Sequence, residues 1–211
     1  MWRKLFRGTV AVVLMQIALV GCGAKRITLN YAPDTSLTTL RDTERVTVYA
    51  FEDRRDSEGD NDPFRVGGVY GGYGNRLSKV LADAPFQKTV ANALVAALRA
   101  RGIDAQVIDD RAYELGTTPP GTVVLAGAIT HFSTEARFTN SAHVRGIVRV
   151  YATGGQVLVE KDISEREQPG TLGGGVFTTE DILQDAMNKV LAKFVNRVAT
   201  DPEIVRTFMR Q

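Results

Sequence analysis

The sequence predicts an α+β fold, in which an antiparallel sheet of about five strands, with a mixed sheet as the alternative, carries two main helices on one face. Three consecutive strand-like segments, at 122–138, 143–152 and 156–164, have no helix between them and indicate an antiparallel meander. Amphipathic helical patterns precede and follow this meander. Because strands and helices do not alternate regularly, a doubly wound parallel sheet is disfavoured.

The composition is that of an ordinary globular protein. The 211 residues are 44% hydrophobic and 24% charged, which excludes intrinsic disorder, collagen and disulfide scaffolds. Three of the 26 basic residues, Arg3, Lys4 and Arg7, lie in the first seven positions, so the remainder holds 23 basic and 24 acidic residues. A nearly neutral body offers no general positive field for nucleic acid, and we expect no nucleic-acid partner.

The first 21 residues have the pattern of an export signal. A basic start is followed by an apolar run at 10–20, which is too short to cross a bilayer of about 30 Å comfortably. The run ends in Leu19, Val20 and Gly21, immediately before Cys22, the single cysteine of the chain. This order resembles the lipobox of bacterial lipoproteins, which implies cleavage before Cys22 and attachment there of diacylglycerol and an N-acyl chain such as palmitate. An ordinary secretory signal and an uncleaved anchor are the alternatives.

These features divide the chain into a signal peptide at 1–21, a lipidated cysteine and tether at 22–44, and a periplasmic α+β domain at 45–211. A triacylated cysteine holds an otherwise soluble domain stably on a membrane. Gly23 and Ala24 follow the cysteine, whereas an aspartate there commonly retains similar lipoproteins in the inner membrane. Its absence favours the periplasmic face of the outer membrane, with the inner membrane as the alternative.

The first strands and the region after them carry the candidate interaction residues. A short strand is expected at 26–31 and a second at 46–51, where β-branched and aromatic residues are frequent. The glycine-rich, charged stretch at 52–81 predicts a long surface loop, with a short hairpin inside it as the alternative. We expect this loop to contact a partner, and its candidate interaction residues are Asp53, Arg54, Arg55, Asp56, Tyr70 and Tyr73.

The middle of the chain predicts a helix and then the meander. Pro85 suits the first turn of a helix at 85–101 because its φ is fixed, and Gly102 suits the C′ position. A short strand is expected at 105–109. The doublet Gly154–Gly155 predicts the tight turn between the last two strands of the meander.

The C-terminal part predicts two more helices. The main one begins at Thr178 or Thr179, with two carboxylates in its first turn, where they interact favourably with the helix dipole. Its apolar residues recur at intervals of three and four up to position 198. A short final helix is expected at 201–209.

No motif with a defined catalytic chemistry stands out. The glycine-rich stretch at 67–75 lacks both the P-loop lysine and the third glycine of a dinucleotide fingerprint. The acidic residues between 53 and 62 do not have EF-hand spacing, and His131 and His143 have no cysteine partners for zinc. No activated serine is recognisable. We therefore expect no metal, no cofactor besides the acyl chains on Cys22 and no enzymatic activity, although the many carboxylates leave an acid–base pair open.

Several segments, in their order along the chain, resemble the YajG family of bacterial lipoproteins. They are the lipobox at Cys22 and the segments 46–56, 94–102, 128–132 and 201–209. The resemblance spans nearly all of residues 22–210 and implies an envelope lipoprotein with no family active site to transfer. At fold level the arrangement is also similar to auxiliary lipoproteins of ABC-type lipid transport systems and to the amino-terminal domain of TolB, which work through protein contacts.

The sequence thus predicts a non-enzymatic, membrane-anchored envelope lipoprotein whose periplasmic domain is a protein-binding or accessory module, with an envelope protein as its partner. The alternative is a lipid- or small-ligand-binding auxiliary component of a transport system, which requires an apolar pocket between sheet and helices. A third class, an envelope hydrolase, requires a convergent cluster of groups with shifted pKa values.

Overall fold

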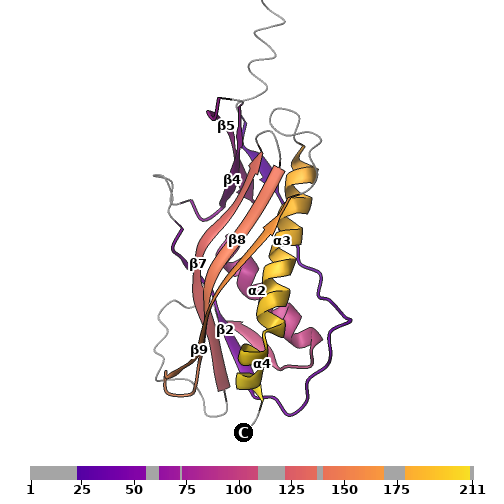
Figure 1. Cartoon of the computed structure of the whole chain (residues 1–211), viewed down its shortest axis with the longest axis vertical. Helices are drawn as coiled ribbons and strands as arrows, with labels where there is room; N and C mark the ends of the chain where they lie inside the picture. Colours follow the sequence, from indigo (N-terminus) through magenta and orange to yellow (C-terminus); the bar gives the residue numbers. More distant parts are fainter. Residues whose placement is uncertain are drawn as a thin grey trace, which may run out of the picture.

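The computed structural model describes residues 23–55, 62–71, 73–108, 122–136, 140–168 and 179–209. In these residues a nine-stranded mixed sheet packs against three helices (Figure 1). The signal peptide, the lipobox and Cys22 lie outside the described residues. The strands are β1 (Lys25–Ile27), β2 (Arg45–Tyr49), β3 (Glu52–Asp53), β4 (Arg65–Tyr70), β5 (Arg76–Ala82), β6 (Ala105–Ile108), β7 (Thr122–Ala136), β8 (Asn140–Tyr151) and β9 (Val157–Glu167), and the helices are α2 (Phe86–Ala100), α3 (Glu180–Thr200) and α4 (Pro202–Phe208).

Strand β7 is the centre of the sheet. Along one edge it pairs antiparallel with β8 over nearly its whole length, and β8 pairs antiparallel with β9. Along the other edge it pairs in parallel with β2 near its start, with β3 near its middle and with β4 near its end. Strand β6 extends the sheet beyond β2, whereas β5 and then β1 extend it beyond β4. The sheet therefore splits into two branches on one side of β7.

The α+β class, the meander and the alternative of a mixed sheet are confirmed, whereas the expectation of an antiparallel sheet of about five strands is wrong. Nine strands form the sheet in the described residues, and the pairs that join β2, β3 and β4 to β7 are parallel. Parallel pairing requires a crossover connection, and the chain between β4 and β7 contains β5, α2 and β6. The pattern within one strand does not specify a partner so far along the chain.

The prediction of a long surface loop at 52–81 is wrong for the described residues of this stretch. The alternative prediction of a hairpin within it is confirmed. Strands β4 and β5 pair antiparallel, and Val66 and Val69 are buried. The glycines have a packing role in this hairpin. A Cβ added to Gly67 would lie 2.1 Å from the carbonyl oxygen of Thr134 on β7, so the close approach of β4 to β7 requires glycine at this position.

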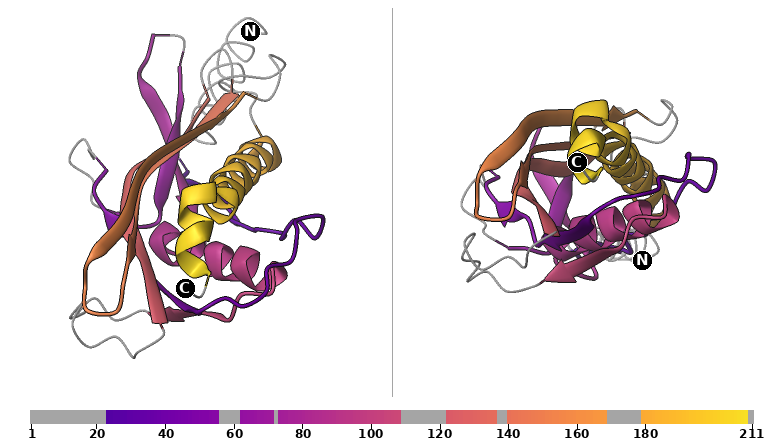
Figure 2. Two further views of the ribbon diagram at one scale, coloured as in Figure 1. Left: turned by 60° about the horizontal axis from the view of Figure 1, so that its bottom comes forward. Right: turned by 90° about the horizontal axis from the view of Figure 1, so that it is seen from below.

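The three helices lie on one face of the sheet, as Figure 2 shows and as the sequence predicts. The interface between helices and sheet is filled by large apolar side chains. The Phe86 ring of α2 stacks on Phe132 of β7 with the ring centroids 5.0 Å apart. Phe194 of α3 approaches the sheet over Gly146 of β8, where an added Cβ would lie 3.2 Å from the phenylalanine ring. The core is therefore closely packed along the centre of the sheet.

The helix boundaries follow the local signals in the sequence. Gly102 follows α2 with a φ of +83°, and Thr179 caps α3 by accepting a hydrogen bond from the backbone N–H of Ile182. The Asp201 carboxylate caps α4 in the same way. None of the helices in the described part of the chain is long and apolar enough to span a membrane.

The segment just after Cys22 is bound to the domain along much of its length. Strand β1 pairs in parallel with β5, starting at Lys25. The next residues donate three hydrogen bonds to amide side chains of α3, so the N-terminal segment is held along that helix from near its start to near its end. These bonds join Thr28 N to Gln184 Oε1 (2.8 Å), Asn30 N to Asn188 Oδ1 (2.9 Å) and Tyr31 Oη to Asn196 Oδ1 (2.7 Å).

Arg101 fixes the continuation of this segment. Its side chain is buried at the end of α2, where burial lowers the pKa of the guanidinium. The guanidinium donates to the carbonyl oxygens of Thr38 (3.2 Å) and Ala199. One buried cation therefore joins the N-terminal segment, the end of α2 and the end of α3, and its charge is balanced by carbonyl dipoles.

Candidate functional site

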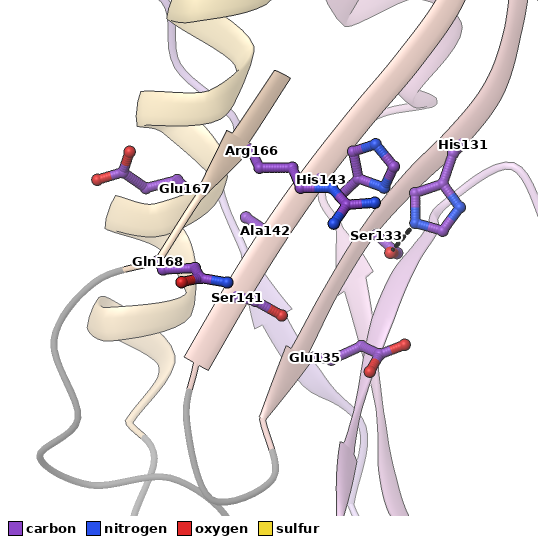
Figure 3. A pocket seen from close by; sticks show the side chains of 9 residues that line it. All are labelled: His131, Ser133, Glu135, Ser141, Ala142, His143, Arg166, Glu167 and Gln168. Atoms are coloured by element: carbon purple, nitrogen blue, oxygen red, sulfur yellow. Dashed lines mark hydrogen bonds between the residues drawn. The ribbon is translucent and has the colours of Figure 1, made fainter. Parts of the chain in front are cut away.

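A polar groove of about 270 Å³ lies on the outer face of β7, β8 and β9, turned away from the helices (Figure 3). Alternate residues of a strand point to opposite sides of the sheet. Phe132 and Val144 are therefore buried under the helices, whereas their neighbours His131, Ser133 and His143 line the groove. In the described part of the chain no helix covers this outer face (Figure 2).

The strand register brings the polar side chains of the groove together. Ser133 of β7, His143 of β8 and Arg166 of β9 are direct neighbours across the three strands. His131 is the preceding outward residue on β7, and its ring lies against that of His143. The two ring centroids are 4.3 Å apart, with the planes inclined by 38°. Residues from three strands thus form one cluster because their pleats coincide.

Each imidazole is held by a serine hydroxyl. His131 Nε2 lies 2.6 Å from Ser133 Oγ, and His143 Nε2 lies 2.9 Å from Ser164 Oγ. These hydrogen bonds fix the direction in which each ring points. They also leave the second nitrogen of each ring for another partner.

Burial keeps both imidazoles neutral. Desolvation is the largest cause that lowers the pKa of His143 to about 4, and the nearby His131, Arg166 and Arg145 lower it further. Desolvation also lowers the pKa of His131, where the charge of Glu135 opposes the effect in part. At neutral pH each ring therefore presents one N–H donor and one acceptor nitrogen.

The charges around the groove are unevenly compensated. Arg145 forms a two-bond ion pair with Asp162, with N–O distances of 2.9 and 2.6 Å, and Glu167 pairs with Lys193 of α3 at 2.5 Å. Arg166 forms no ion pair with any described residue. Its guanidinium is exposed at the groove, so this site presents a cation beside neutral donors and hydroxyls.

The arrangement is suited to binding. A serine hydroxyl in contact with a neutral imidazole is also the first requirement of a nucleophile and its base. Strand β8 is paired on both sides, so its backbone N–H groups are committed to the ladder. Among the described residues no group of three or more His, Cys, Asp or Glu side chains is placed to hold a metal ion.

None of the described interaction residues expected from the sequence lines this groove, although the charge of Arg55 lowers the pKa of His131. Arg55 is an internal clamp, because its guanidinium forms two 2.9 Å bonds to Asp53, donates to the carbonyl oxygen of Arg65 and lies 3.9 Å from the centre of the Phe86 ring. Its side chain is only 12% exposed. Arg55 therefore fixes the start of β4 on α2 and has little surface left for a partner.

The other expected residues differ in exposure. Arg54 pairs with Glu52 at the surface, with 2.6 Å between nitrogen and oxygen. Tyr70 is half-buried against Gly68, whereas Tyr73 is fully exposed at the turn between β4 and β5. Asp56 lies outside the described residues. The structure thus does not gather these residues into one site.

The sequence pattern around His131 and His143 does not predict the cluster that the structure forms around them. The available signal is the alternation of polar and apolar residues at 131–136 and 140–150, which marks one polar face on each strand. The alternation does not say which polar residues become neighbours. That depends on the register of β7 with β8, which includes a shift between Ile129 and His131.

No protein-family model and no curated protein matches the chain. Among solved structures, protein XCC0632 from Xanthomonas campestris, described by the family model DUF330, is 12% identical with a TM-score of 0.60 and covers 87% of this chain and 97% of its own. A structure described as an uncharacterized protein is 14% identical with a TM-score of 0.50, covering 84% of this chain and 98% of its own. Lipoprotein GNA1162 from Neisseria meningitidis is 13% identical, with a TM-score of 0.35, and covers 72% of this chain and 99% of its own.

These similarities show a fold that occurs in bacterial proteins. At 12% identity the likeness to XCC0632 carries neither a function nor site residues to this chain. The more specific resemblance to the YajG family stays a prediction from the sequence.

Proposed function

We propose that this protein is a non-enzymatic envelope lipoprotein, anchored through Cys22 to the periplasmic face of the outer membrane, whose domain binds an acidic group of another envelope protein in the groove. The export signal and lipobox support the anchor. The domain supports the accessory role, since its groove presents the Arg166 guanidinium beside hydroxyl and imidazole groups that can donate hydrogen bonds.

The observation that carries the binding proposal is the position of Arg166 beside His143, Ser133 and Ser141 on an open sheet face. A guanidinium without an ionic partner among the described residues is best satisfied by a carboxylate or phosphate, which it binds through two parallel hydrogen bonds. The hydroxyls and imidazole N–H groups supply further donors. A bound carboxylate would therefore pair with the Arg166 guanidinium, the one arginine or lysine among the described residues that line the groove.

An acidic side chain of a protein fits this site better than an acyl chain does. A lipid carrier needs an apolar pocket. The groove instead has a polar lining, and Phe86, Phe132 and Phe194 fill the described interface between helices and sheet. The lipid-carrying alternative consequently has no supporting feature in the described core.

A matched pair of arginine variants tests the binding site. Arg166→Gln removes the exposed cation, whereas Arg149→Gln removes a cation from the same outer face that already pairs with Glu160. The probe is a short glutamate peptide, and the readout is the NMR titration of the His143 ring. We expect the peptide to raise the pKa of His143 above its value of about 4 in the wild type and in Arg149→Gln, and to leave it unchanged in Arg166→Gln.

The same pair can be tested in cells. A photo-crosslinking amino acid at Ser141 should attach to one envelope protein in the wild type and in Arg149→Gln, and the adduct should disappear in Arg166→Gln. Equal responses of the two arginine variants in both experiments would refute a site centred on Arg166.

The anchor is tested by Cys22→Ser. Labelled palmitate should enter the wild-type protein and sediment with outer membranes. The serine variant should take up no label, because it lacks the thiol that accepts the lipid. Equal labelling of both proteins would contradict lipidation at Cys22.

A further inference from the structure

The β4–β5 hairpin lies at the end of the domain where the chain arrives from Cys22. Strand β1 runs parallel to β5, with Lys25 opposite Val80. Going from Val80 back to Arg76 leads toward the hairpin turn, and at about 3.3 Å per residue this distance is roughly 13 Å. Figures 1 and 2 both show the hairpin projecting past the first turn of α3.

Covalent geometry limits the distance of the lipid from the domain. Lys25 is three residues from Cys22, and three residues span at most about 10 Å. The hairpin turn extends farther than this from the level of Lys25. When the lipid on Cys22 is in a bilayer and the hairpin points toward the membrane, the turn at Tyr73 therefore reaches the depth of the headgroups.

The turn carries an apolar ring that the fold does not use. Tyr73 has a relative exposure of 103%, and Gly74 beside it has a φ of +80°, which places the ring at the tip of a tight turn. A tyrosine ring with a polar hydroxyl is the type of side chain that concentrates at the boundary between headgroups and acyl chains.

The charges on the same strands favour an anionic surface. Residues 23–28 and 65–82 contain five basic residues and no acidic residue; the basic ones are Lys25, Arg26, Arg65, Arg76 and Lys79. Acidic side chains flank these strands at Asp62 and Asp83, which lie at the end of the hairpin opposite its turn, and at Glu135 of β7. Each basic residue close to an anionic leaflet contributes about 1 kcal/mol to membrane association.

We propose that the β4–β5 hairpin is a second membrane contact, which places Tyr73 among the headgroups of an anionic lipid surface next to the lipid on Cys22. This inference rests on the proposed lipidation of Cys22. A single lipid site leaves a domain free to rotate, whereas two contacts fix its orientation. The groove on β7–β9 would then keep a constant angle to the membrane.

Tryptophan fluorescence tests the contact directly. The only tryptophan of the chain is Trp2, so a protein that begins at Cys22 has none. Tyr73→Trp places a single reporter at the tip, and Leu158→Trp places a matched reporter on β9, where the leucine is 42% exposed. Both lipidated proteins are reconstituted into vesicles of phosphatidylethanolamine and phosphatidylglycerol, with and without lipids brominated high on the acyl chain.

We expect the brominated lipids to quench Tyr73→Trp by at least about half and to shift its emission to the blue, while Leu158→Trp stays unquenched. Vesicles of phosphatidylcholine alone should quench Tyr73→Trp less, because they lack negative charge. Equal emission of the two reporters would overturn the second contact, and equal quenching in both kinds of vesicle would overturn its assignment to an anionic surface.

The mass of the N-terminal peptide separates this inference from the proposed function. If Cys22 carries no lipid, the anchor itself is wrong, and the hairpin inference falls with it. If Cys22 is lipidated and Tyr73→Trp is not quenched, the hairpin inference alone is wrong.

Discussion

On β7, Phe132 points toward the helices and is 2% exposed, whereas its neighbours His131 and Ser133 point away from them into the groove. The two faces share one backbone and one set of ladder hydrogen bonds. They differ in what a side chain can contribute, because the inner face excludes water and the outer face keeps it. Residues that are adjacent in the sequence can therefore differ in role, because the inner ones stabilise the core and the outer ones line the groove.

The largest expected effect comes from truncating the inner face. Phe132→Ala removes a ring that stacks on Phe86, and we expect the free energy of unfolding to fall by about 3–5 kcal/mol. Ser133→Ala, one residue away on the outer face, should lower it by less than about 1 kcal/mol. Urea unfolding followed by circular dichroism measures both. Similar losses for the two variants would show that the faces are not separate in energy.

A smaller loss is expected from overfilling the inner face. Gly146→Val places atoms against Ile129 and Phe194, where an added Cβ already lies 3.0 and 3.2 Å from the nearest side-chain atoms. We expect a loss of about 1–3 kcal/mol. Phe194→Leu, combined with Gly146→Val, should recover part of that loss by making room. If the losses of Gly146→Val and Phe194→Leu simply add in the double variant, there is no direct steric conflict between the two positions.

The outer face should make stability depend on pH. The pKa of His143 is about 4 in the folded chain and about 6.5 in the unfolded chain, so between these values the unfolded state binds more protons. Stability is therefore full above pH 6.5 and decreases as the pH falls toward 4.

For His143 we expect a loss of about 1 kcal/mol, which allows for screening of the partly exposed ring by solvent. His131 should add a change of the same sign, because burial also lowers its pKa. The difference in unfolding free energy between wild type and His143→Gln isolates the first effect. If this difference does not vary between pH 7 and 4, His143 is not shifted as described.

The smallest effect is expected at an ion pair of the outer face. Arg149 Nε lies 2.5 Å from Glu160 Oε2; the arginine side chain is 25% exposed and the glutamate side chain 53%. Arg149→Gln should change the free energy of unfolding by less than about 1 kcal/mol, because water and salt screen such pairs. Thermal unfolding at low and high salt measures it. A loss comparable to that of Phe132→Ala would remove the distinction between the faces.

Much of the local structure could be predicted because its signals are local. Pro85 and Gly102 bracket α2, Thr179 caps α3, and Gly154 with Gly155 adopts the positive φ values that the β8–β9 turn requires. Each of these residues acts through backbone geometry within a few positions of itself. Such constraints do not depend on what the rest of the chain does.

The hairpin of β4 and β5 and the groove could not be predicted in the same way. Gly67 lies in a glycine-rich stretch whose composition is typical of a loop. Glycine is needed there for another reason, because the backbone of Thr134, far away in the sequence, lies too close for a Cβ. Likewise, His131 and His143 become a pair only through the register of two strands. The sequence places Arg55 in a surface loop, whereas in the structure it lies on the ring of Phe86. This contact depends on the tertiary fold and has no local signal.

The contacts of the N-terminal segment determine when the chain can finish folding. Thr28 and Asn30 bind residues of α3 that are 156 and 158 positions later, so the first residues of the domain wait for nearly the last ones to be synthesised. Contacts between such distant residues close slowly, since the whole intervening chain must be ordered first. Residues 28–31 therefore stay undocked from α3 until that helix has formed, and a chain that is cut short before α3 keeps the pairing of β1 with β5 but loses these contacts.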